Sequence, residues 1–217
     1  MKFYFKVIQK MVTHRHTYTQ ITQLFIFQTI FFTSLSAMEE LQNQLVQVAL
    51  AGNQNTRIGE LIRAGAQVNS PDKNGLLPLV AAYNSRKFRT FEILLDFDAN
   101  PDATVNEQGH TLLMRTIIDD YFEQFKKLLA KDANINAVDQ QGQTALMKAA
   151  QHERLDYVLM LLDLKADISI MDNAKKTAHL HSKETHIIRS REAQRKIFNA
   201  IYEKEQDIQA SKYYAQF

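Results

Sequence analysis

The chain has 217 residues, enough for one domain or one repeat array with extensions. Its 45% hydrophobic and 23% charged content is ordinary for a folded soluble protein, and three prolines with six glycines exclude collagen-like or linker-like character. The absence of cysteine excludes disulfides, thiolate metal sites and cysteine nucleophiles, and a net charge of +2 leaves no basic excess that would indicate a nucleic-acid partner.

The first 37 residues differ in charge from the rest. They contain four basic residues (Lys2, Lys6, Lys10 and Arg15) and no Asp or Glu, so the other 180 residues carry 22 basic and 24 acidic side chains. An apolar run, Leu24 to Leu35, follows the basic part, and small residues follow it up to Ala37. This order predicts a signal peptide over residues 1–37, cleaved near Ala37, and therefore a secreted or periplasmic protein.

Two alternatives remain open for this segment. Residues 17–37 contain no charged side chain and could stay uncleaved as an anchor in a membrane. Their most apolar part, Ile21 to Leu35, would span about 22 Å as a helix, which is shorter than the roughly 30 Å hydrocarbon core. Alternatively, translation starts at Met38 and the protein is cytoplasmic.

A repeat of about 33 residues runs through the rest of the chain. Four kinds of residue recur with this period: a helix-end alanine, a leucine pair, a turn glycine and an acidic or amide turn starter. The alanines stand at Ala66, Ala99, Ala133 and Ala166, with spacings of 33, 34 and 33. The pairs are Leu61-Ile62, Leu94-Leu95, Leu128-Leu129 and Leu161-Leu162; the glycines are Gly75, Gly109 and Gly142; the turn starters are Asp72, Asn106, Asp139 and Asp172.

The segment Asp139 to Ala150 (DQQGQTALMKAA) resembles the signature of the ankyrin-repeat family, in which a turn precedes Thr-Pro-Leu-His and paired alanines. The resemblance covers roughly residues 44–180. It implies an all-α solenoid of about four to five helix-turn-helix repeats with β-turn or hairpin tips. The array is expected over residues 38–185, with units near 38–71, 72–105, 106–138, 139–171 and a degenerate 172–185.

Departures from the family pattern are also visible. Val80, Met114 and Met147 stand where the family has histidine, which puts the usual side-chain bracing of each turn in doubt, although Thr111, Thr144 and Thr177 remain as candidate helix caps. After the array, Arg189 to Tyr214 contains no proline or glycine. Residues 186–217 are expected to form a helical extension that covers the last unit through Ile197, Phe198, Ile201 and Ile208. The alternative is a free helix that docks on a partner.

Little in the sequence indicates catalysis. There is no glycine-rich phosphate loop and no two-histidine zinc motif. The histidines His179, His181 and His186 are spaced by two and five, which does not align them on one helix face, and a polar end cap is favoured over a metal site. The adjacent Asp119 and Asp120 are interpreted as a solvated helix end. No enzymatic activity, cofactor or metal is expected.

The resemblance implies a protein-protein interaction module, expected to be exported and monomeric. Alternatives are a membrane-tethered scaffold and a microbial effector-like protein acting on a host target. In the family, partners contact the turn tips and the concave face of the first helices. At the tips this implies Lys73, Asn74, Glu107, Gln108, Gln140 and Gln141. On the helix face it implies Asn84, Ser85, Arg115, Ile118, Asp119, Lys148, Gln151 and His152, positions that we expect not to be needed for packing.

Overall fold

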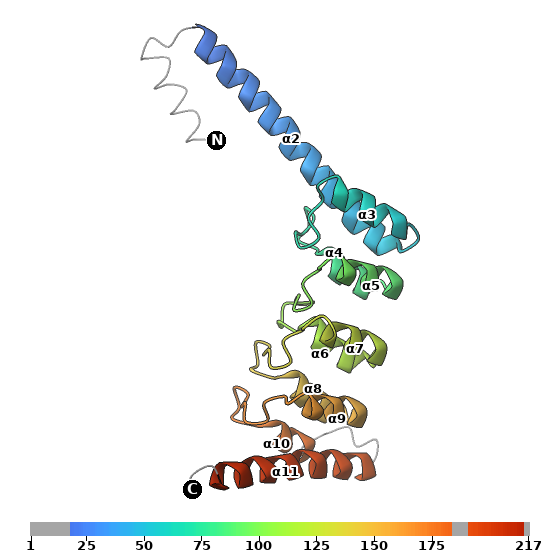
Figure 1. The fold of residues 1–217 in the computed structure, drawn as a ribbon, viewed down its shortest axis with the longest axis vertical. Helices are drawn as coiled ribbons and strands as arrows, with labels where there is room; N and C mark the ends of the chain where they lie inside the picture. The colour runs from blue at the N-terminus through green and yellow to red at the C-terminus, as the bar shows by residue number, and fades with distance from the viewer. Residues whose placement is uncertain (1–17, 184–190, 215–217) are drawn as a thin grey trace.

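The computed structural model describes residues 18–183 and 191–214, with side chains over 26–182 and 191–211. The described residues form a stack of helix pairs with a long helix at each end (Figure 1). The helices are α2 (Tyr18–Ala51), α3 (Asn55–Arg63), α4 (Pro78–Asn84), α5 (Phe88–Asp96), α6 (Leu112–Asp119), α7 (Phe122–Leu129), α8 (Ala145–Gln151), α9 (Leu155–Asp163), α10 (Ala178–Lys183) and α11 (Arg191–Tyr214). Within these ranges the β-type pairing consists of two isolated bridges, so the all-α prediction is confirmed.

The helices stack in chain order, as the repeat predicts. The inner helices α2, α4, α6, α8 and α10 form one row, and the outer helices α3, α5, α7 and α9 form a second row beside it (Figure 1). The inner row is not evenly spaced, because α6 packs closely on α8 whereas α4 and α6 approach each other less closely. A single helix pair cannot bury its own apolar surface, and the neighbouring pair in the stack covers it.

The periodic leucines form the core of this stack. Leu94, Leu128 and Leu161 are fully buried, and Leu95 and Leu162 are nearly so. Leu129 is the exception, because it is only partly buried and lies at the edge of the core. Burying one such side chain contributes roughly 1.5–3 kcal/mol, so the leucine pairs are a major source of stability.

The three aspartate turn starters brace their own turns at the tips. Asp139 Oδ1 accepts hydrogen bonds from the backbone N–H groups of Gln141 at 2.9 Å and Gln143 at 2.8 Å. Asp72 and Asp172 make the same pair of bonds in their own turns. The predicted caps at Thr111 and Thr144 are confirmed, since each hydroxyl accepts from the backbone N–H three residues on.

Helix α2 crosses the expected leader boundary without a break. Its C-terminal part packs on α3 and α4 through buried residues that include Leu45, Val46 and Ala49. Its N-terminal part projects beyond the stack (Figure 1) and exposes a run of apolar side chains. These are Ile26, Phe27, Ile30, Phe31, Phe32, Leu35 and Met38, each about half or more exposed. Among the described residues, no helix combines the length and apolar character that crossing a membrane requires.

At the other end, α11 covers the last helix pair of the stack. Ile197 and Ile201 are fully buried against α9 and α10, which confirms the capping prediction for the described part of the extension. The ring of Phe198 lies 4.3 Å from that of His179. The expectation for Ile208 is wrong: it is 37% exposed, because α11 continues past the helices that it covers.

Candidate binding surface

The predicted tip residues lie at the surface. Lys73, Asn74, Glu107, Gln108, Gln140 and Gln141 are all exposed. Successive tips are joined by backbone hydrogen bonds, from Gln140 N–H to the Gln108 carbonyl at 3.0 Å and from Asn173 N–H to the Gln141 carbonyl at 2.9 Å. From unit three onward, the tips therefore present polar side chains from a linked backbone rather than from independent loops.

Most predicted residues of the inner-helix face are partly accessible. Asn84 is exposed, and Ser85, Arg115, Ile118, Asp119, Gln151 and His152 are half-buried. Several of these side chains form hydrogen bonds with one another or with a neighbouring residue. Arg115 Nη2 donates to both carboxylate oxygens of Asp119, at 2.7 and 3.0 Å, and the Tyr83 hydroxyl donates to Asp119 Oδ2 at 2.8 Å. The structure thus brings residues of α4 and α6 into one polar group.

The expectation that these positions are not needed for packing is wrong for Lys148. It is 6% exposed, and its ammonium nitrogen lies 2.8 Å from Asp139 Oδ2 and 2.6 Å from Gln143 Oε1. The physical reason is that the carboxylate of Asp139 needs a cation where the array shields it from water. Lys148 is therefore a structural residue of the turn.

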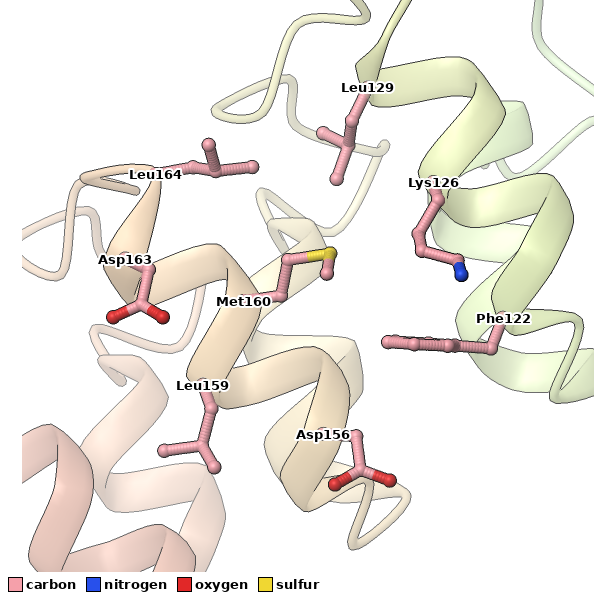
Figure 2. Close-up of a pocket in the computed structure, with 8 residues that line it drawn as sticks. All are labelled: Phe122, Lys126, Leu129, Asp156, Leu159, Met160, Asp163 and Leu164. Atoms are coloured by element: carbon pink, nitrogen blue, oxygen red, sulfur yellow. The ribbon is translucent and has the colours of Figure 1, made fainter.

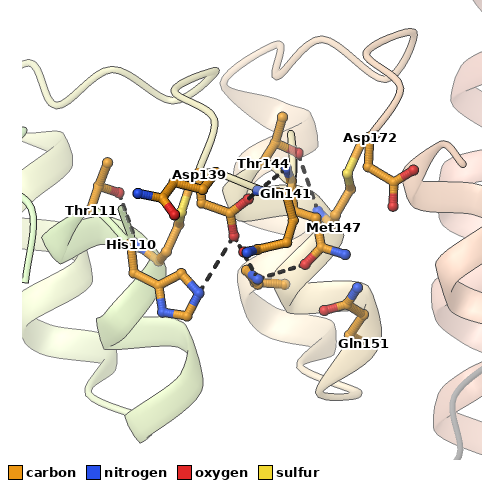
Figure 3. Close-up of polar contacts among 12 residues, drawn as sticks. His110, Thr111, Asp139, Gln141, Thr144, Met147, Gln151 and Asp172 are labelled. Carbon is orange, nitrogen blue, oxygen red and sulfur yellow. Dashed lines mark hydrogen bonds and ion pairs between the residues drawn. The ribbon is translucent and has the colours of Figure 1, made fainter. Parts of the chain in front are cut away.

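Polar side chains that include His110, Asp139 and Gln151 form a row beneath the tips (Figure 3). Lys148 joins this row through its ion pair with Asp139. His110 Nε2 lies 3.4 Å from Asp139 Oδ2, so unit three contacts the turn of unit four. In unit five, His181 Nε2 lies 2.9 Å from Asp172 Oδ2, and its other ring nitrogen lies 3.0 Å from Gln151 Nε2. His181 stands four residues after Thr177, as Lys148 does after Thr144, and so repeats the role of Lys148.

The ionisation of this row follows from its surroundings. Burial lowers the pKa of His110, and the nearby Lys148 cation lowers it further, against the attraction of Asp139. Burial acts to raise the pKa of Asp172, but the Lys176 backbone N–H and the side chains of His181 and Gln143 outweigh it, so the pKa is lowered. Near neutral pH the carboxylate of Asp172 is therefore ionised and the imidazole of His110 is neutral.

Asp119 and Asp120 lie at the C-terminal end of α6, as the sequence indicated, and the Asp120 side chain is 52% exposed, but both carboxylates also pair with other side chains. Asp119 faces Tyr83 and Arg115, whereas Asp120 has φ +63° and accepts from Arg154 Nη1 at 2.7 Å. Because Tyr83 lies in unit two and Arg154 in unit four, the two carboxylates link unit three to both of its neighbours.

The outer helices carry an apolar groove. It lies between α7 and α9, with a volume of about 650 Å³ (Figure 2). Phe122, Leu129, Leu159, Met160 and Leu164 supply its apolar lining, and Lys126, Asp156 and Asp163 lie at its edges. Leu159 and Leu164 are 43% and 52% exposed, which shows that the groove is open to solvent.

The histidine cluster does not gather into a metal site in the described part of the chain. His179 lies beside Glu205 and Phe198, and His181 bonds to Asp172, so the two rings serve different contacts. His186 lies outside the described residues. No group of three or more potential ligands is placed to hold a metal ion within residues 26–182 and 191–211.

Comparison with known families identifies the stack. The family model for ankyrin repeats in three copies matches residues 45–139 and 80–172, which together cover more than half of the chain. The chain belongs to the ankyrin-repeat family. No curated protein matches it. Ankyrin repeats are protein-binding modules, so the arrangement of tips and inner helices bears on how this ankyrin protein would hold a partner.

One set of residues that joins the ankyrin units escaped the sequence analysis. Asn69, Asp102 and Asn136 each accept a hydrogen bond from a backbone N–H of the next unit, at 2.7–2.8 Å. They recur with spacings of 33 and 34, the period of the other series. That shared period was a sequence signal that could have found them.

Proposed function

We propose that this ankyrin protein is a non-catalytic module that binds a partner protein through its inner-helix face and turn tips. The observation that carries the proposal is the polar group of Tyr83, Arg115 and Asp119 between units two and three. Its members are fixed by mutual hydrogen bonds and yet leave Arg115 and Asp119 partly accessible. Binding to side chains that are already ordered loses less conformational entropy, which favours affinity.

The tips extend this surface. Their exposed amide and charged side chains stand on a backbone that is held by carboxylate-braced turns and by bonds between units. A rigid backbone that carries variable polar side chains is suited to specific recognition. Lys148 is not part of the proposed surface, because it is buried.

The test is a selection of binders from a displayed random-peptide library on the immobilised full-length chain, followed by NMR mapping of the footprint. We expect shifts at the inner-helix face of units two to four, including Asn84 and Ile118. The double variant Asn84→Ala/Ile118→Ala should weaken the selected peptides. The matched control, Arg89→Ala with Asp156→Ala on outer helices, should not. A footprint confined to the outer helices or to α2 would overturn the assignment of this surface.

A second candidate role concerns the site of action. We propose that residues 17–37 hold the array at a membrane, supported by the exposed apolar side chains from Ile26 to Leu35 on α2. Cleavage near Ala37, which would release an exported array, is the competing expectation. Mass spectrometry of the native N-terminus separates the two, because a mature chain that begins near residue 38 excludes the tether.

A further inference from the structure

A polar cavity of about 230 Å³ opens between the C-terminal ends of the inner helices α4 and α6. Its lining is Tyr83, Asn84, Arg86, Arg115, Asp119 and Tyr121. Three of these (Asn84, Arg115 and Asp119) were expected on the partner-binding face. Arg86, Tyr83 and Tyr121 were not part of that expectation.

The cavity follows from a large residue at a position where the family has a small one. Tyr83 occupies the place that Ala150 takes in unit four, and α4 and α6 approach each other less closely than α6 and α8. The Tyr121 ring packs edge-on against Tyr83 at 6.0 Å and against Phe88 at 4.8 Å. These rings lie between the two units, and the Tyr83 hydroxyl donates to Asp119.

The hydrogen-bonding groups of the cavity are mostly donors without a partner. Both oxygens of Asp119 already accept from Arg115, and one also accepts from Tyr83. Arg115 Nε is shielded from water with no partner in the described structure. The side chains of Arg86 and Asn84 also make no hydrogen bond or ion pair with the described residues.

The charges of the residues that line the cavity also favour an anionic ligand. Two guanidinium groups and one carboxylate line the cavity, so it carries a net positive charge after Asp119 has been neutralised. A buried donor that finds no acceptor costs free energy, and a guanidinium offers paired N–H groups in the geometry of a carboxylate. An anionic acceptor would both accept hydrogen bonds from these donors and balance the positive charge, whereas a neutral amide would only accept hydrogen bonds.

We propose that this cavity binds a carboxylate side chain, Asp or Glu, of the partner protein, between the guanidinium groups of Arg86 and Arg115. The proposal rests on the proposed function, because it names the chemistry that the inner-helix face recognises. Tyr83, held by Asp119, positions Arg115 and does not itself contact the ligand. Asn84 at the rim donates to the same carboxylate.

The test uses the full-length chain and two small probes, N-acetyl-glutamate methylamide and its glutamine analogue, titrated against the arginine side-chain Nε–H signals in NMR. We expect a saturable shift at Arg86 and Arg115 with the glutamate probe and none with the glutamine probe. Arg86→Gln should raise the Kd roughly three- to fivefold, as for an exposed ion pair, and Arg115→Gln roughly tenfold. The matched control is Arg89→Gln, an exposed arginine of the same unit, which should leave the Kd unchanged.

Equal shifts from both probes, or no saturable shift, would overturn the proposal. Inorganic phosphate forms a further arm, and tighter binding of phosphate than of the glutamate probe would also overturn the carboxylate assignment, in favour of a phosphorylated side chain. Folding of each variant is checked by circular dichroism, and Arg86→Gln keeps the test valid if Arg115→Gln unfolds. If the array selects peptides but the glutamate probe does not bind, this inference fails while the proposed function stands. If no peptide is selected although the probe binds, the cavity is a carboxylate site, but the proposed function fails and with it the assignment of that carboxylate to a partner protein.

Discussion

The ammonium nitrogen of Lys148 lies 2.8 Å from the carboxylate of Asp139, and the two side chains are 8% and 0% exposed. Asp139 also holds two backbone N–H groups of its own turn and faces His110 of the preceding unit. One buried ion pair thus connects the helix α8, the tip of unit four and unit three.

Replacing Lys148 with Met should destabilise the array by about 3–5 kcal/mol, because the substitution leaves a buried carboxylate without its cation. Urea unfolding followed by circular dichroism measures the effect. The matched control is Lys127→Met on the outer helix α7, which is 53% exposed and should change stability by less than about 1 kcal/mol. Asp139→Asn in the Lys148→Met background should recover part of the loss, and additive losses would contradict the pairing.

Stability should fall as the pH drops below the ordinary pKa of histidine. Burial, with the Lys148 cation next, lowers the pKa of His110 in the folded state, so the unfolded chain binds more protons in that range. The contribution of His110 is complete above pH about 6.5 and is lost as the pH falls from there through the folded pKa. Urea midpoints at pH 8 and pH 5 measure the slope. His110→Gln should flatten it, and an unchanged slope in this variant would assign the dependence to other groups.

Two turn glycines should differ in their tolerance of alanine. Both have positive φ, +75° at Gly142 and +81° at Gly75, so alanine costs roughly 1–2 kcal/mol of backbone strain at either position. At Gly142 an added Cβ would also lie 3.1 Å from the backbone nitrogen of Asn173, which bonds to Gln141, whereas at Gly75 it would meet open space. Gly142→Ala should therefore lower the Tm more than Gly75→Ala does, and equal shifts would mean that the tip contact is not rigid.

The two leucines of unit three should also differ. Leu128 is fully buried, so Leu128→Ala should cost about 2–5 kcal/mol, because it removes buried apolar surface and leaves an enclosed cavity. Leu129 lines the open groove between α7 and α9, so Leu129→Ala should cost roughly 1–2 kcal/mol, because solvent can enter the space that it leaves. Denaturant unfolding of both variants checks the order, and a reversed order would contradict the placement of the groove.

The sequence by itself determined the class and the order of the elements. The 33-residue period of alanines, leucine pairs, glycines and turn starters predicted helix pairs stacked in chain order, because each unit carries an apolar face that only a neighbour can bury. The sequence also predicted the caps at Thr111 and Thr144 and the capping role of Ile197 and Ile201. These predictions depend only on spacing within one helix.

Tertiary structure alone decided which polar side chains remain free. Lys148 and Arg115 have the same place in the repeat, and Gln151 lies three residues further along its inner helix, yet Lys148 is buried on Asp139, Gln151 bonds to His181 and Arg115 opens onto a cavity. Lys148 pairs with Asp139 of its own unit, but the differences at Gln151 and Arg115 arise from contacts between units, such as Tyr83 meeting Asp119 across 36 residues. Spacing within a unit cannot show them, because the burial and charge of a side chain depend on the residues that the next unit places against it.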